Sequence, residues 1–179
     1  MIKDLKFLHI LTSSLIIEII MLFLFKFTNQ TSNAINNWYK KLEWTAVILD
    51  VLSIMIGFYL AKFIYKYLVR NKYINQNNEF IKFLFIVLVV QIIHDFSFYF
   101  LVVRPTKPRI NYVIDEFKQY AKHYSVQAVI ADSLIYLFTT PLLYYIVSKT
   151  SDDINTFTSI VSVYIIGYLL YQKALYLKI

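Results

Sequence analysis

Four acidic residues stand inside long apolar stretches of the sequence, where an acidic side chain is costly. They are Glu18, Asp50, Asp95 and Asp132, and His94 directly precedes Asp95. A charged group at the centre of a membrane span costs at least about 2.5–3.5 kcal/mol, so such residues usually face a bundle interior and mark ion or proton pathways. Carboxylates can replace the hydration shell of a cation, and a histidine titrates near neutral pH. These residue types therefore indicate a cation or proton channel or transporter.

The positions of the four acids within their apolar stretches predict that they lie in one layer. Glu18 and Asp95 come about nine residues before the ends of their stretches. Asp50 and Asp132 come about seven residues after the starts of theirs. At a helical rise of about 1.5 Å per residue, all four lie roughly 10–14 Å below the same membrane surface. We therefore predict ion binding or proton relay at this layer, with His94 tuning the protonation.

Two other interpretations of the acid layer remain open at this point. In a metal-dependent membrane enzyme, the same four carboxylates are candidate ligands for Mg²⁺ or Mn²⁺. Its substrate would be a lipid phosphate, and the residues that could hold the phosphate or contact lipid head groups are Lys40, Lys41, Arg104, Lys107 and Arg109. In a structural or interaction protein, each carboxyl group would be protonated and hydrogen-bonded to a neighbouring helix. The sequence carries no signature of a membrane transferase or phosphatase, and no cofactor beyond a bound cation is expected.

Five apolar stretches must position these acids. Hydrophobic residues make up 59% of the 179 residues and charged residues 16%, against about 25% charged in an ordinary soluble domain. Each stretch has about 20 or more residues, which is enough for a helix to cross about 30 Å of hydrocarbon. We predict spans at 5–27, 44–68, 80–103, 125–147 and 155–178. The predicted fold is thus an all-α membrane protein, a bundle of five transmembrane helices that forms one domain.

Two connecting segments, 28–43 and 104–124, have the amphipathic pattern of short helices. The apolar residues at helical spacing are Ile35, Trp38, Tyr39 and Leu42 in the first, and Ile110, Val113, Ile114, Phe117 and Tyr120 in the second. We therefore predict two short interfacial helices. With five spans, both lie on the membrane side of the C-terminus. That side carries ten Lys and Arg residues against seven on the other, which weakly favours it as cytoplasmic.

The sequence also contains an internal repeat. Segment 46–52 (AVILDVL) matches segment 128–134 (AVIADSL), with an acid at the same position in each. The order of features is the same in 5–68 and 80–147: a span with one acid, an interfacial helix, then a span beginning Ala-Val-Ile. Because the two units lie two spans apart, they share one orientation, which predicts a pseudo-twofold axis along the membrane normal. The last span, 155–178, closes the bundle.

Composition excludes several other classes of site. The chain has no cysteine, which excludes disulfides, thiolate metal sites and thiol nucleophiles. It has only two glycines and no glycine-rich phosphate loop. The net charge of +7 falls mostly in loops and at helix ends, and no nucleic-acid-binding motif accompanies it. The expected partners are membrane lipids, a cation or proton and, around a shared axis, further copies of the chain, but no nucleic acid.

Three segments carry a resemblance to a known family: 94–99 (HDFSFY), 114–121 (IDEFKQYA) and 128–133 (AVIADS). Segments 37–41 and 46–50 fit it as well. The chain resembles uncharacterised small multi-span membrane proteins encoded by giant nucleocytoplasmic large DNA viruses. That family carries no established activity to transfer. The resemblance implies a multi-pass protein of a virion's internal membrane or of infected-cell membranes.

Overall fold

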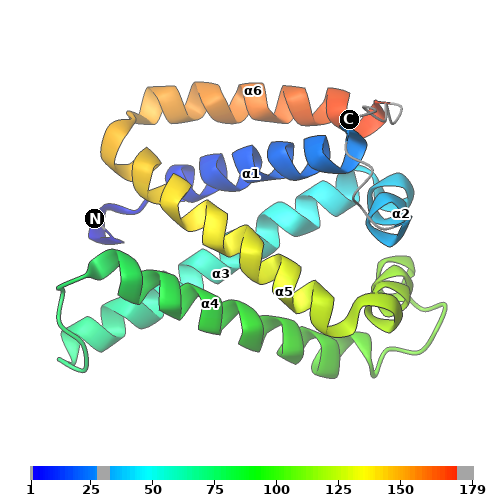
Figure 1. The fold of residues 1–179 in the computed structure, drawn as a ribbon, viewed down its shortest axis with the longest axis horizontal. Helices are drawn as coiled ribbons and strands as arrows, with labels where there is room; N and C mark the ends of the chain where they lie inside the picture. The colour runs from blue at the N-terminus through cyan, green and yellow to red at the C-terminus, as the bar shows by residue number, and fades with distance from the viewer. Residues whose placement is uncertain (1, 28–32, 173–179) are drawn as a thin grey trace.

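The computed structural model describes residues 2–27 and 33–172, which form helices joined by short connections (Figure 1). The α-helices are α1 (Phe7–Phe27), α2 (Asn33–Leu42), α3 (Trp44–Arg70), α4 (Glu79–Phe98), α5 (Tyr112–Lys149) and α6 (Asp152–Tyr171). A short 3-10 helix, η1 (Ile2–Asp4), precedes α1, and the π-helical turn η2 (Tyr99–Val103) continues α4. No strand occurs in the described residues.

Five segments are long and apolar enough to cross a membrane. They are Phe7–Phe27, Trp44–Arg70, Glu79–Val103, Val126–Lys149 and Asp152–Tyr171. The predicted five-helix membrane bundle is therefore confirmed, and the chain is a multi-pass membrane protein. The predicted end of the last span, 173–178, lies outside the described residues.

The outer surface of the bundle is suited to hydrocarbon rather than to water. Large apolar side chains are exposed on several spans, among them Phe63, Phe85, Leu101 and Ile160. Soluble monomers rarely expose apolar surface on this scale. In a bilayer the same side chains contact lipid tails, so lipid is the expected neighbour of this surface.

The helices alternate in direction and leave two distinct ends. α1 packs against α3, α5 and α6, while α4 packs against α3 and α5. In Figure 1 the N-terminus, the connection 71–78 and the connection between α5 and α6 lie at one end. α2, the connection 104–111 and the end of α6 lie at the other, which we call the α2 end (Figure 1). An odd number of spans places the start of α1 and the end of α6 at opposite ends, as observed here.

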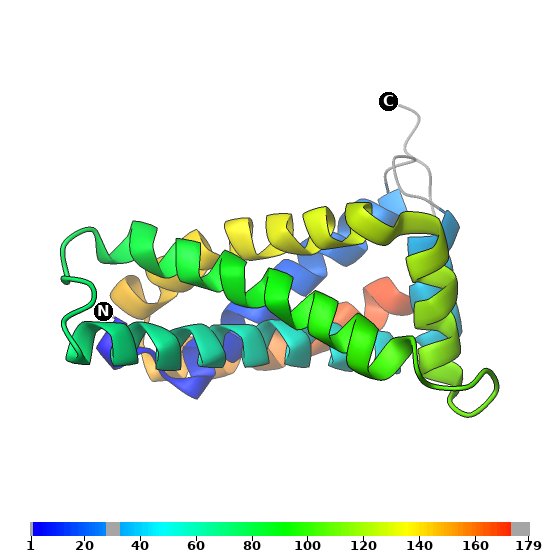
Figure 2. The same cartoon turned by 90° about the horizontal axis from the view of Figure 1, so that it is seen from below.

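The second predicted interfacial helix is not a separate element. α5 runs from Tyr112 to Lys149 without interruption, so it contains both the amphipathic segment and the fourth span. Its start is capped by the side chain of Asn111, which accepts a hydrogen bond from the backbone N–H of Ile114 (3.1 Å). Figure 2 shows the first turns of α5 standing across the end of the bundle before the ribbon turns into the span. α2 and α3, in contrast, are separated at Glu43, whose φ of 49° interrupts the helix.

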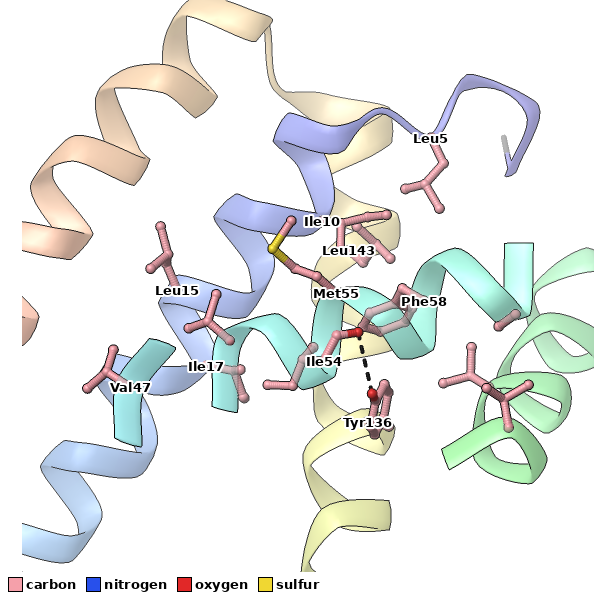
Figure 3. Packing of buried hydrophobic residues seen from close by; sticks show 14 of the residues in the cluster. Leu5, Ile10, Leu15, Ile17, Val47, Ile54, Met55, Phe58, Tyr136 and Leu143 are labelled. Atoms are coloured by element: carbon pink, nitrogen blue, oxygen red, sulfur yellow. Dashed lines mark hydrogen bonds between the residues drawn. The ribbon is translucent and has the colours of Figure 1, made fainter. Parts of the chain in front are cut away.

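The core lies where α1, α3, α4 and α5 meet, and Figure 3 shows part of it. Phe58 is buried beside Tyr136, with ring centroids 5.2 Å apart. The Tyr136 hydroxyl donates to the backbone carbonyl oxygens of Ser53 (3.0 Å) and Ile54 (3.4 Å, dashed in Figure 3). Small residues at helix contacts permit such close approach in membranes, and Gly57 is the one that faces Tyr136.

Candidate functional site

The four intramembrane acids come from four different helices and form two pairs. Glu18 on α1 interacts electrostatically with Asp50 on α3. Asp95 on α4 interacts electrostatically with Asp132 on α5. Asp132 also interacts with Asp50, which connects the two pairs across the bundle. The sequence placed these residues at one depth, and the structure brings all four into one interacting set.

The first pair is completed by residues of α2. The Asp50 Oδ2 atom accepts hydrogen bonds from the Tyr39 hydroxyl (2.9 Å) and from the Trp38 ring nitrogen (3.3 Å). The Tyr39 hydroxyl also interacts with the carboxyl group of Glu18. Glu18 is only 2% exposed, and its Oε1 atom has no hydrogen-bond partner among the described residues. A buried carboxylate oxygen without a partner is costly, so the neutral, protonated form of Glu18 is favoured.

Tyr39 itself is held in its neutral form. Burial raises the pKa of the Tyr39 hydroxyl well above its usual value, and the neighbouring carboxyl groups of Asp50 and Glu18 raise it further. Each of these effects disfavours a tyrosinate. At physiological pH the hydroxyl therefore keeps its proton and can both donate and accept a hydrogen bond.

The second pair is held by a polar network between α4 and α5. The side-chain N–H of Gln91 donates to Asp95 Oδ2, and the Ser133 hydroxyl donates to the side-chain oxygen of Gln91 (2.9 Å). His94 Nδ1 lies 3.5 Å from the other oxygen of Asp95. Asp95 also interacts with Asp132 on α5, and two neighbouring carboxyl groups disfavour a state in which both are charged. This pair therefore has the composition of a shared-proton site.

At the α2 end, beside the site, aromatic and charged side chains of α2 and α5 pack against each other. The ring centroid of Phe117, on the first turns of α5, is 4.7 Å from that of Trp38 and 5.2 Å from that of Phe98. Lys41 on α2 donates to both carboxylate oxygens of Glu116 on α5, at 2.8 Å each. The hydrogen bond to Glu116 raises the pKa of Lys41, which therefore stays charged. α2, which bonds Asp50 through Trp38 and Tyr39, is thus also joined to α5.

The basic residues predicted to contact lipid phosphates fall into two groups. Lys41 is exposed and paired with Glu116, and its contact with a head group stays a prediction. The other four candidates are exposed: Lys40, Arg104, Lys107 and Arg109. Their contact with lipid head groups stays a prediction.

The metal-site alternative finds little support in the arrangement. Among the residues that the structure describes, no three His, Asp or Glu side chains gather closely enough to hold a metal ion. Mg²⁺ and similar cations require several oxygen ligands around one point. Carboxyl groups arranged in two linked pairs are better suited to protons than to a metal cage.

Three polar residues of the site, Tyr39, Gln91 and Ser133, were not among the site residues predicted from the sequence. Tyr39 belongs to an interfacial helix and was assigned to its apolar face, since nothing local shows that its hydroxyl reaches into the bundle. Gln91 lies one turn before Asp95, and this i, i+4 spacing was a usable signal. Ser133 directly follows Asp132, but its role depends on the contact of α5 with α4.

Comparison with known proteins adds no further assignment. No family model, no curated protein and no solved structure matches the chain. The candidate site therefore rests on its own chemistry, and the resemblance to proteins of giant viruses stays a prediction.

Proposed function

We propose that this protein moves protons through a membrane, as a channel or a coupled transporter, by exchange at the two carboxyl pairs. The observation that carries the proposal is the linked set of four carboxyl groups from four helices, joined through Asp50 and Asp132. Intramembrane carboxyl groups in such sets are typical of proton relays. His94 lies beside Asp95 and would pass protons to or from the second pair.

The neighbours of the carboxyl groups favour protons over larger cations. Oxygens of Asp50 and Asp95 already accept hydrogen bonds from Tyr39, Trp38 and Gln91. A bound Na⁺ or K⁺ would have to compete with these donors for the same carboxyl groups. Among the described ion pairs, the only basic side chain that approaches any of the four acids is that of His94. Unpaired buried charges are costly. We therefore expect protons to neutralise the four carboxyl groups.

Proton flux in proteoliposomes tests the proposal. A K⁺ gradient with valinomycin sets the membrane potential, and a trapped pH dye reports the proton flux. K⁺ and Na⁺ fluxes are measured in separate vesicles without valinomycin. We expect wild-type protein to move protons and Asp132→Asn to reduce the rate by at least about tenfold, because losing a proton-transfer group typically costs about 10²–10⁴ in rate. Asp153→Asn, which alters an exposed acid at the start of α6, is the matched control and should leave the flux unchanged.

Two results would contradict the proposal. One is a wild-type protein that is folded in the vesicles and moves no protons under any gradient. The other is a proton flux that Asp132→Asn leaves at the wild-type rate. A flux of K⁺ that depends on Asp132 would instead assign the site to a larger cation.

A structural role is the second candidate, in a virion's internal membrane or an infected-cell membrane as the family resemblance implies. The hydrogen bonds that Gln91 makes to Asp95 and Ser133 favour it, because they join α4 to α5 as a structural network would. This alternative predicts that replacing Asp95 or Asp132 lowers stability in a protein without flux. Unfolding of the same variants in detergent, measured beside the flux, separates the two.

A further inference from the structure

The side chain of Tyr39 lies between two acids that belong to different transmembrane helices. It is 6% exposed, and its ring contacts Phe25 of α1, with centroids 5.6 Å apart. Its hydroxyl oxygen is 2.9 Å from Asp50 Oδ2 on α3 and interacts with the carboxyl group of Glu18 on α1. Tyr39 therefore reaches the acid layer from α2, a helix that does not itself cross the membrane.

The groups that face Tyr39 come from every element around it. α1 supplies Glu18, α3 supplies Asp50, and α2 supplies the ring N–H of Trp38, which donates to the same oxygen of Asp50. α5 contributes Asp132, which interacts with Asp50. None of these groups is a permanent cation. The Tyr39 hydroxyl thus has a carboxyl group of α1 and a carboxyl group of α3 as its neighbours.

We infer that Tyr39 is the residue that passes protons between Glu18 and Asp50. The inference rests on the proposed proton exchange at the acid pairs and adds a relay residue to it. In the step, the Asp50 carboxylate takes the proton of the Tyr39 hydroxyl. At the same time the Tyr39 hydroxyl oxygen accepts the proton of the Glu18 carboxylic acid. Glu18 becomes a carboxylate, Asp50 becomes a carboxylic acid, and Tyr39 is unchanged. No oxidant, metal or further reactant is needed.

Tyr39 has the chemistry for this step, and its neighbour Trp38 does not. A phenol hydroxyl donates one hydrogen bond and accepts others, whereas an indole N–H only donates. Both side chains bond the same oxygen of Asp50. Removing either donor therefore weakens the support of Asp50, but only the loss of Tyr39 disconnects Glu18. This contrast supplies the matched control.

The experiment uses the full chain in lipid vesicles and two measurements. Infrared spectroscopy follows the carbonyl band of protonated carboxyl groups after transfer to D₂O, with Glu18→Gln identifying the band of Glu18. Proton flux is measured on the same preparations. We expect Tyr39→Phe to slow both the deuteration of Glu18 and the flux by at least about tenfold, since a proton-transfer group is lost. Trp38→Phe, which removes only a donor to Asp50, should slow deuteration clearly less than Tyr39→Phe does, and Tyr39→His, which can donate and accept, should restore most of the rate.

Several outcomes overturn the inference, and they are separable from failure of the proposed function. Deuteration of Glu18 at the wild-type rate in folded Tyr39→Phe overturns the relay even if the wild type conducts protons. An equal loss in Trp38→Phe overturns it too, because the effect would then belong to the support of Asp50. A wild type without flux, but with deuteration that depends on Tyr39, overturns the proposed function and leaves the relay in place. If Tyr39→Phe does not fold, Tyr39→Met, which also lacks a hydroxyl, takes its place with the same expected loss.

Discussion

At the scale of single residues, the contact of Gly57 with Tyr136 leaves no room for a side chain. A Cβ atom at residue 57 would lie 2.1 Å from the Tyr136 hydroxyl oxygen and 2.7 Å from the ring carbon that bears it. We expect Gly57→Ala to lower the free energy of unfolding by about 1–3 kcal/mol, the usual cost of overpacking. Unfolding in detergent, followed by the fluorescence of the two tryptophans, measures this. At Gly167 the nearest atom would be 3.4 Å away, so Gly167→Ala should be neutral or slightly stabilising, and equal effects at both glycines would refute the prediction.

Gln91 offers a second test at this scale. It is 2% exposed and joins Ser133 on α5 to Asp95 on its own helix. Gln91→Leu removes both hydrogen bonds and leaves Asp95 without that donor, so we expect a loss of about 1–3 kcal/mol in unfolding free energy. Ser133→Ala should cost less, because the single hydroxyl proton of Ser133 is shared between Gln91 and the backbone carbonyl oxygen of Val129 (2.7 Å), which weakens the bond to Gln91. A smaller loss in Gln91→Leu than in Ser133→Ala would contradict this order.

The sequence predicted the acids at this scale but not their partners. Glu18 and Asp132 stand out because acidic residues are rare in apolar spans, and their depth follows from the helical rise alone. Which carboxyl group pairs with which depends on the rotation and contact of the helices. Tyr39 shows the limit most clearly, since an amphipathic helix with a tyrosine on its apolar face has many places to lie.

At the scale of elements, the ion pair between Lys41 and Glu116 contributes to the attachment of α2 to α5. Glu116 is buried and Lys41 is 35% exposed in its side chain, with 2.8 Å between Lys41 Nζ and Glu116 Oε2. Glu116→Gln leaves the Lys41 ammonium without its counter-charge, so we expect α2 to separate from α5 more often than in the wild type. Hydrogen–deuterium exchange should show faster exchange of the α2 amides and little change in α3. Lys40→Gln, at the exposed neighbouring residue, is the control, and unchanged exchange in Glu116→Gln would show that packing alone holds α2.

The elements themselves were largely predictable, and the exception has a physical reason. Apolar length and hydropathy predict all five spans, since only helices satisfy the backbone inside hydrocarbon. Amphipathic spacing predicts the apolar face of segment 113–120 equally well for a separate helix and for the first turns of a longer one. α5 continues through this region, whereas α2 stops before α3 at the positive φ of Glu43. The predicted repeat remains a prediction, although α1 packs on α3 and α5 as α4 packs on α5 and α3.

At the scale of the whole molecule, the order of spans predicts which loops share a side of the membrane. The connection 71–78 follows α3 and lies at the end opposite to the connection 104–111, because α4 and η2 run between them (Figure 1). Since the chain contains no cysteine, single cysteines at exposed positions report sidedness directly. We expect Asn77→Cys and Lys107→Cys to react with a membrane-impermeant maleimide from opposite sides of sealed vesicles, and Lys40→Cys on α2 to react from the side of Lys107→Cys. The larger number of basic residues predicts that the α2 end faces the cytoplasm. Labelling of residues 77 and 107 from the same side would mean that α4 does not cross the bilayer. Asp95 would then lie outside the hydrocarbon, where a charged carboxylate is not costly, and the argument for proton exchange at Asp95 would be lost.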